Sequence, residues 1–191
     1  MSARCSISSA TDPAGVIDFW RQAGPKAWFA ADPAFDAACR GFAGLHETAA
    51  AGGLAAWEGH AQSALALILV TDQFPRNIYR HSALAFATDE MARNVADRAI
   101  ARGFDQATEA ELRLFFYLPF EHHEDAASQA RAVAMCEKLT AETGVKDWLD
   151  FALLHQRLIA RFGRFPHRNA VLGRISTPEE TAYLAEGGFA G

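Results

Sequence analysis

Apolar residues recur along this chain at intervals of three and four residues, the spacing that places them on one face of a helix. Within residues 60–73, for example, Leu65, Ile68, Leu69 and Asp72 fall at positions i, i+3, i+4 and i+7. Stretches in which apolar and polar residues alternate, as in a half-buried strand, are almost absent. The pattern predicts an all-α fold of about eight helices, stacked as antiparallel hairpins.

Capping residues predict where these helices begin and end. The start signals are Asp12-Pro13, Asp32-Pro33 and the capping boxes Thr108-x-x-Glu111 and Thr177-x-x-Glu180. Further helices are expected over residues 82–102, 124–143 and 147–162. Because proline disfavours a helical residue before it, the helix over residues 60–73 is expected to stop at Phe74-Pro75.

The apolar faces of two helices predict buried residues. On the helix over residues 82–102, we expect Leu84, Thr88, Met91 and Val95 to point inward. The helix over residues 147–162 has the most regular apolar stripe: Phe151, Leu154, His155, Leu158, Ile159 and Phe162. A histidine in such a stripe is usually a hydrogen-bonded core residue, and that is our interpretation of His155.

Composition narrows the class of protein. The chain has 191 residues, half of them hydrophobic and 21% charged, which suits one globular domain. We assign residues 1–15 to an N-terminal tail and residues 16–189 to a single all-α domain. The net charge of -5 argues against a nucleic-acid partner. The longest apolar run, Ala64 to Val70, is too short to span a bilayer, so no membrane association is expected. Three cysteines without a CxxC pair, and no signal-peptide core, favour a cytoplasmic location.

Two segments share an uncommon combination of phenylalanine, proline, arginine and asparagine. One is "DQFPRNIYR" (residues 72–80) and the other is "RFGRFPHRNAVLGR" (residues 161–174). Several guanidinium groups in one recess repel one another unless anions lie between them. The leading hypothesis is therefore a recess that binds a small anionic ligand. The expected ligand-binding residues are Asp72, Arg76, Asn77, Arg80, Arg164, His167, Arg168 and Asn169.

The protein's own carboxylates offer another explanation for the arginines. Asp72 lies on an apolar stripe, where a bare charge is unfavourable, so we expect it to contact an arginine. Glu121, Glu124 and Asp125 of the segment "YLPFEHHED" are further candidate partners. In that case the arginines pair with carboxylates, or with carbonyls at helix ends, and the network serves the fold alone.

Two histidines raise the alternative of catalysis. A carboxylate of Glu121 or Asp125 can orient the ring of His122 as a general base. A hydrolase would use His122 or His167 as its acid–base group, with arginines stabilising developing negative charge. Glu121, His122, His155 and His167 are all metal-ligand types, but no diagnostic spacing joins them, so no metal or cofactor is expected.

Several long motifs resemble one bacterial family. They are "WFAADPAFD", "LVTDQFPRNIYR", "AFATDEMAR", "FFYLPFEHHED" and "RFGRFPHRNAVLGRISTPEE". From about Val16 to Phe189, the chain resembles the bacterial domain-of-unknown-function family numbered 924. The resemblance implies a tetratricopeptide-like helical fold and no particular reaction. His123 stands where this family commonly has a serine, so no role that needs a hydroxyl is expected there.

The sequence leaves three functions open. Besides the anion-binding protein and the hydrolase, a tetratricopeptide-like module would bind a protein or peptide partner without catalysis. An anion site predicts arginines that lack protein partners, and a hydrolase predicts a histidine within hydrogen-bond reach of a carboxylate. An interaction module predicts an exposed apolar groove.

Overall fold

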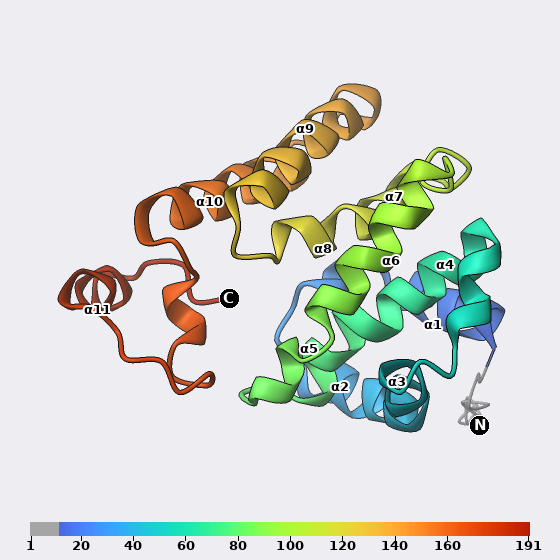
Figure 1. The fold of residues 1–191 in the computed structure, drawn as a ribbon, viewed down its shortest axis with the longest axis horizontal. Helices are drawn as coiled ribbons and strands as arrows, with labels where there is room; N and C mark the ends of the chain where they lie inside the picture. The colour runs from blue at the N-terminus through green and yellow to red at the C-terminus, as the bar shows by residue number, and fades with distance from the viewer. Residues whose placement is uncertain (1–11) are drawn as a thin grey trace, which may run out of the picture.

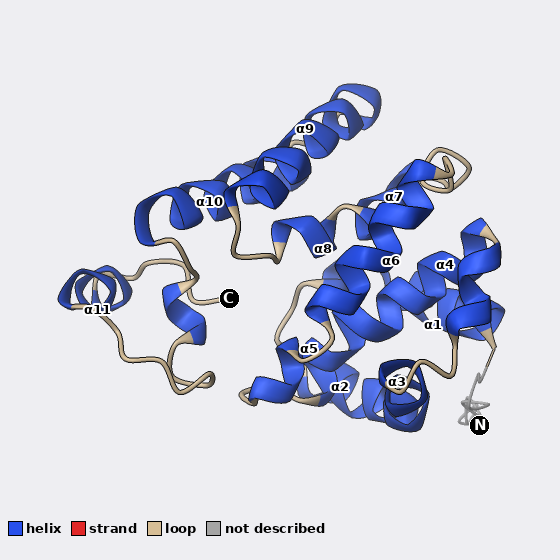
Figure 2. Cartoon of the chain, viewed as in Figure 1, coloured by secondary structure: helices blue, strands red, loops and turns tan. Residues whose placement is uncertain are grey.

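The computed structural model describes residues 12–191, and all regular structure in that range is helical (Figure 2). This confirms the predicted all-α class. The α-helices are α1 (Pro13–Trp28), α2 (Pro33–Cys39), α3 (Ala43–Ala50), α4 (Ala61–Ile68), α5 (Phe74–Ile78), α6 (Asp89–Ala101), α7 (Ala110–Arg113), α8 (Leu118–Glu121), α9 (Ala126–Thr143), α10 (Asp147–Phe162) and α11 (Pro178–Ala185). Short 3-10 turns join several of them: η1 (Arg40–Phe42), η2 (Ala55–Gly59), η4 (Ala83–Phe86), η5 (Leu114–Phe116) and η6 (Pro166–Arg168).

Side-chain caps form at three of the predicted helix starts within residues 12–191. Asp12 accepts from the Gly15 amide, Asp32 from the Ala34 amide, and Thr177 from the Glu180 amide. Because α1 begins at Pro13, residues 13–15 belong to the first helix. The rest of the assigned N-terminal tail lies outside the described residues, apart from Asp12.

The predicted capping box at Thr108 is wrong. The Thr108 hydroxyl donates instead to the carbonyl oxygen of Phe104, at 2.9 Å, which belongs to the preceding turn. Glu109 occupies the N-cap position of α7 and makes no side-chain capping bond. The helix therefore begins one residue later than the capping box predicted, and Thr108 is not at its N-cap.

The predicted helix end at Phe74-Pro75 is also wrong. The chain stays helical from α4 through a π-helical turn, η3 (Leu69–Gln73), into α5. The Phe74 amide donates to the carbonyl of Leu69, five residues back, which is the π-helical bond. Pro75 then stands in the first turn of α5, where a missing N–H is tolerated.

The main core is built around α4. This helix packs against α1 and α6, and residues 64–70 are all buried. Large aromatic side chains fill the space between the elements, and the largest fully buried ones include Trp20, Phe74, Phe115 and Phe116. Trp20 packs edge-on to Phe115, with ring centroids 5.4 Å apart. Within residues 12–191, no helix combines the length and the apolar character needed to cross a membrane.

The C-terminal third forms a smaller second cluster. The paired helices α9 and α10 lead into η6 and α11, and the chain after α11 turns back towards the middle of the molecule (Figure 1). Leu158, Ile159 and Phe165 are buried there, with Tyr183 and Phe189 packed against them.

Two residues predicted to point inward are exposed. Leu84 is 55% exposed because it lies in the turn η4, and the regular helix starts only at Asp89. Phe151 is 51% exposed. The buried face of α10 runs through Ala152, His155 and Ile159, so Phe151 lies at the edge of the stripe and not at its centre.

Candidate functional site

The two arginine-containing segments meet at the N-terminal end of α6. Arg76, from α5, makes two hydrogen bonds of 3.0 Å to the carboxylate of Asp89. Arg168, from η6, lies 3.4 Å from the same carboxylate. Both guanidinium groups also lie over the ring of Phe86, at 5.7 Å and 4.6 Å from its centroid. Asp89 and Phe86 therefore join segments that are about ninety residues apart in the sequence.

The π-helical turn places Asp72 inside the protein. Asp72 is fully buried, and its carboxylate accepts a hydrogen bond of 2.6 Å from Gln73. The Thr71 carbonyl, which an ideal α-helix would use internally, accepts from the Thr88 hydroxyl at 2.6 Å. π-Helical turns occur frequently at functional sites, because they redirect one side chain without ending the helix.

The buried carboxylate of Asp72 holds the ring of His122. Nδ1 of His122 lies 2.9 Å from Oδ1 and 3.1 Å from Oδ2 of Asp72. Because a carboxylate accepts, this nitrogen carries the proton, and the neutral ring has its lone pair on Nε2. Nε2 has no hydrogen-bond partner among residues 12–191 and is not sealed from solvent. The expected partner was Glu121 or Asp125, and the observed one comes from another helix.

Nearby charges set the protonation of this pair. Burial opposes ionisation of Asp72, but Arg76 and then His122 outweigh it and hold the pKa of the carboxyl below its usual range. Burial is also the main influence on His122, where, with the positive charge of Arg76, it lowers the pKa of the imidazole. The negative charge of Asp72 opposes that shift without reversing it. His122 is therefore neutral near pH 7 and able to accept a proton.

A second carboxylate and imidazole lie beside the first pair. Oε1 of Glu121 is 3.0 Å from Nδ1 of His155, and the ring centroids of His122 and His155 are 6.4 Å apart. Nδ1 of His155 also donates to the carbonyl oxygen of Phe151 at 2.9 Å. His155 is buried, as expected, but it faces the candidate site as well as the core.

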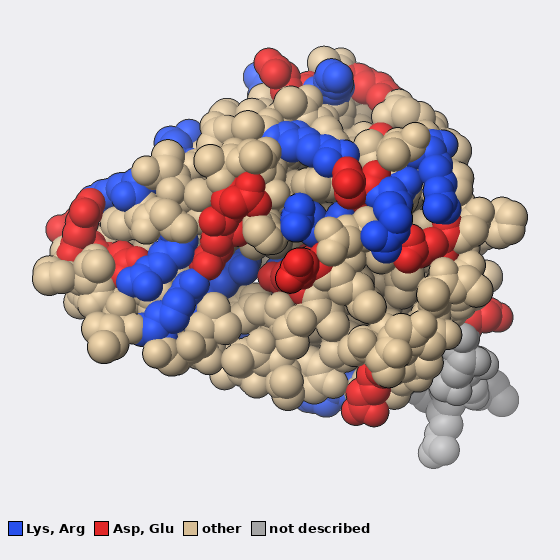
Figure 3. Space-filling model, in the orientation of Figure 1, with Lys and Arg blue, Asp and Glu red and all other residues tan. Residues whose placement is uncertain are grey.

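Most of the predicted ligand-binding arginines are already paired. Arg80 makes two bonds of 2.7 Å to Asp36 and a third to Asn77. Arg164 makes bonds of 2.6 and 2.8 Å to Glu180, which also accepts from Asn169. These bonds tie the turn after α5 to α2, and the segment after α10 to α11. On the face shown in Figure 3, basic and acidic side chains lie next to one another in the same way.

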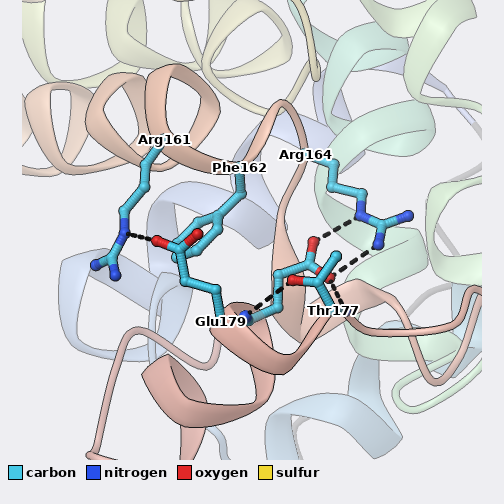
Figure 4. A pocket seen from close by; sticks show the side chains of 6 residues that line it. Arg161, Phe162, Arg164, Thr177 and Glu179 are labelled. Carbon is cyan, nitrogen blue, oxygen red and sulfur yellow. Dashed lines mark hydrogen bonds and ion pairs between the residues drawn. The ribbon is translucent and has the colours of Figure 1, made fainter.

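The eight predicted ligand-binding residues therefore do not line one recess. Asn77 and Arg80 lie on the α2 side, and Arg164 and Asn169 lie on the α11 side. A hollow of about 360 Å³ beside Arg164 is lined by pairs that satisfy each other (Figure 4). A second hollow, of about 210 Å³, lies between α6 and α9 and includes Tyr117. Neither hollow reaches His122.

Arg168 is less completely paired than Arg76, Arg80 and Arg164. Its Nη1 donates to the carbonyl of His122 at 3.0 Å, but Nε and Nη2 have no partner among residues 12–191. Phe86 and Phe165 lie 4.6 and 4.5 Å from the guanidinium carbon. Burial, and then the positive charge of Arg76, lower the pKa of Arg168 to about 10. This buried cation has unused donors, which is uncommon for arginine.

The remaining predicted residues have other surroundings. His167 lies between Phe165 and Phe189 and has no carboxylate partner among residues 12–191, and burial lowers its pKa to about 3. Asp125 caps α9 through the Ser128 amide and contacts His123. No group of three or more metal-ligating side chains within residues 12–191 is arranged to hold an ion.

Comparison with known proteins gives the family of the chain. A family model described as "Bacterial protein of unknown function (DUF924)" matches residues 16–188. The chain belongs to this family. The chain is similar to a solved structure, that of ATU0120, a protein of unknown function from Agrobacterium tumefaciens. The two share 48% sequence identity, and the TM-score is 0.86. That match covers 92% of this chain and 97% of the other. No curated protein matches the chain. The tetratricopeptide-like relationship stays a prediction.

Two residues of the candidate site were not predicted from the sequence. Asp89 and Phe86 connect the two arginine segments, and neither was singled out. Asp89 stands in the first turn of α6, where an acidic residue is favourable in any helix, so nothing local marks it. Its position within the motif "AFATDEMAR" was the available signal.

Proposed function

We propose that this DUF924 chain is a hydrolase that acts on an ester of a small anionic compound, with His122 as its general base. The observation that carries the proposal is the bond between Asp72 and Nδ1 of His122, which leaves Nε2 unpartnered. A carboxylate that fixes one ring nitrogen and frees the other is the arrangement that general-base histidines use.

The proposed step moves one proton. Nε2 of His122 takes it from a water molecule while the water oxygen bonds to the electrophilic atom of the ester. Asp72 stabilises the imidazolium that forms, because its negative charge lies at the opposite nitrogen. The unused donors of Arg168 are suited to stabilise the negative charge that develops on the substrate.

Hydrolysis of p-nitrophenyl phosphate and p-nitrophenyl acetate tests the proposal. The variants are His122→Gln, which removes the base, and His60→Gln, a matched change at an exposed histidine. We expect kcat/KM to fall by at least about 100-fold in His122→Gln and to stay unchanged in His60→Gln. Equal rates in the wild type and His122→Gln, or no hydrolysis by the wild type, would overturn it.

Anion binding without catalysis is the second candidate, and the buried Nε of Arg168 favours it. Titration with inorganic phosphate, followed through the imidazole resonances of His122, separates the two. A saturable shift that Arg168→Gln abolishes, in a protein without esterase activity, supports binding alone. The exposed apolar side chains Phe29, Leu84 and Phe151 come from separate elements, and they do not favour a peptide-binding groove.

A further inference from the structure

Glu121, the last residue of α8, and His122, the residue after it, contact side chains of two different helical segments. Glu121 contacts His155 of α10, and His122 contacts Asp72 of the π-helical turn. The result is two carboxylate–imidazole pairs whose ring centroids are 6.4 Å apart. That separation brings both rings within reach of one ligand the size of a phosphate group.

Glu121 is the unusual member of this set. The residue is only 3% exposed. Apart from its contact with His155, its carboxylate has no hydrogen-bond or ion-pair partner in residues 12–191. Its polar contact is Nδ1 of His155, at 3.0 Å. Elsewhere at this site each buried carboxylate has an arginine or an amide, as Asp72 does. Neither oxygen of this carboxylate is sealed from solvent, so within residues 12–191 His155 is the group that Glu121 is placed to orient.

The proton of His155 can be placed. Nδ1 faces two acceptors, the Phe151 carbonyl and the Glu121 carboxylate, so this nitrogen carries a hydrogen in every protonation state. The second nitrogen, Nε2, has no partner among residues 12–191 and is not sealed from solvent. Nε2 is therefore the ring nitrogen of His155 that is free to face a ligand, as Nε2 is for His122.

We propose that His155 is the second acid–base group of this site, with Glu121 as its positioning residue, and that the substrate is a phosphate ester that contacts both imidazoles. This inference rests on the function proposed above. Neither the charge of the guanidinium groups nor the pair at Asp72 supplies a proton to a leaving group, and a protonated His155 does.

The proposed step hydrolyses the phosphate ester with both imidazoles. The oxygen of a water molecule bonds to phosphorus, and its proton passes to Nε2 of His122. The bond from phosphorus to the ester oxygen breaks, and that oxygen keeps the electron pair. It receives the proton from Nε2 of His155 and leaves as an alcohol. The products are the alcohol and inorganic phosphate, and exchange with solvent resets both rings.

Leaving-group dependence tests the role of His155. A general acid matters most when the leaving oxygen is a strong base, as in phenyl phosphate, and least for the p-nitrophenyl ester. We expect His155→Gln to slow phenyl phosphate hydrolysis by at least about 100-fold, and p-nitrophenyl phosphate hydrolysis much less. Glu121→Gln should reproduce this difference in weaker form, and Phe151→Ala, on the same helix, should show none.

The pH profile gives a second readout that a structural role would not move. The wild type is expected to show a bell-shaped kcat/KM, and His155→Gln is expected to lose the alkaline limb and keep the acid limb. Equal slowing of both esters with an unchanged bell would overturn the inference.

Protection from diethyl pyrocarbonate distinguishes failure of this inference from failure of the proposed function. At inorganic phosphate about ten times its dissociation constant, modification of both His122 and His155 should slow about tenfold, while exposed His60 reacts unchanged. Protection of His122 alone would show that His155 is structural and leave the general base in place. Protection of neither ring would overturn the phosphate-ester site, and hydrolysis of p-nitrophenyl acetate that depends on His122 would then still support the general base.

Discussion

Oδ1 of Asp72 lies 2.9 Å from Nδ1 of His122, although fifty residues separate them in the sequence. The contact requires a fully buried carboxylate, which the π-helical turn supplies, and a ring that α8 turns towards it. The charge of Asp72 is shared between His122 and Arg76.

Replacing Asp72 by asparagine keeps the shape of the side chain and removes its charge. We expect Asp72→Asn to lower the free energy of unfolding by about 2–4 kcal/mol, because buried charged groups lose their partner. Urea denaturation measures the change. Asp125→Asn is the matched control, since asparagine caps a helix as well as aspartate does. Equal losses in the two variants would contradict the importance of the buried charge.

Asp89 separates two positive charges, which predicts chemical rescue by an external anion. Asp89→Ala leaves Arg76 and Arg168 facing each other without the carboxylate that both contact. We expect the free energy of unfolding to fall by about 2–4 kcal/mol. Inorganic phosphate should restore part of this stability, whereas sodium chloride at the same ionic strength should not. Thermal unfolding in the two salts measures this. Asp97→Ala, which removes an exposed ion pair, should show neither the loss nor the rescue.

Stability should fall as the pH drops from about 6.5 towards 4. The folded-state pKa of His167 is lowered to about 3 by burial, and then by Arg168 and His155, with Glu124 opposing. Between these pH values the unfolded chain binds a proton that the folded chain does not, so unfolding becomes more favourable as the pH falls. His122, whose pKa is also lowered, acts in the same direction.

Urea denaturation at pH 7, 5.5 and 4.5 checks this dependence. One such group contributes a slope of up to about 1.4 kcal/mol per pH unit. His167→Gln should reduce the slope of unfolding free energy against pH by the contribution of one titrating group. His60→Gln, at an exposed position, should leave this slope unchanged. An unaltered slope in His167→Gln would show that His167 titrates normally in the folded protein.

The segment after α11 covers two histidines, and its removal should expose them. The Phe189 ring lies 4.9 Å from His155 and 5.3 Å from His167, between ring centroids. The Phe189 amide is held by one bond of 2.8 Å to the Tyr183 hydroxyl. We expect Phe189→Ala to lower stability by about 1–2 kcal/mol and to speed the reaction of both histidines with diethyl pyrocarbonate.

Gly188→Ala should also expose the two histidines, by displacing the backbone of the segment after α11. A Cβ on Gly188 would stand 2.6 Å from the Tyr183 carbonyl oxygen, so Gly188→Ala must displace the segment. Phe151→Ala, at an exposed position of α10, is the control for loss of a phenyl ring. Unchanged reactivity of His155 and His167 in both test variants would mean that the segment does not limit access.

The helices were predictable because their signals are local. Apolar spacing marks α9 and α10, and Thr177 with Glu180 marks the start of α11. The π-helical turn was not predictable in the same way. Leu65, Ile68, Leu69 and Asp72 fit the ordinary helical period, and one wider turn does not disturb that spacing.

The candidate site was predictable only in part. Its residue types followed from the composition of two segments, but the partner of each charge depends on contacts between helices. Glu121 stands next to His122 in sequence and contacts His155 in space. Neighbouring residues at the end of a short helix point in different directions, so adjacency predicted the wrong pair.

Asp72 and Arg76 lie on one uninterrupted helical stretch, residues 61–78, with Arg80 two residues beyond it. Through these side chains the stretch is fastened to α8, α6 and α2. Because the three ion pairs are made from one continuous, largely helical segment, they cannot move independently of one another. We therefore expect residues 61–80 to form the rigid side of the candidate site. In the proposed hydrolase, adaptation to esters of different size falls instead to residues 163–191, where Arg168 and Phe189 belong to turns that can be lengthened or shortened. We therefore expect the ester selectivity of the proposed hydrolase to change with the length of the turns in residues 163–191.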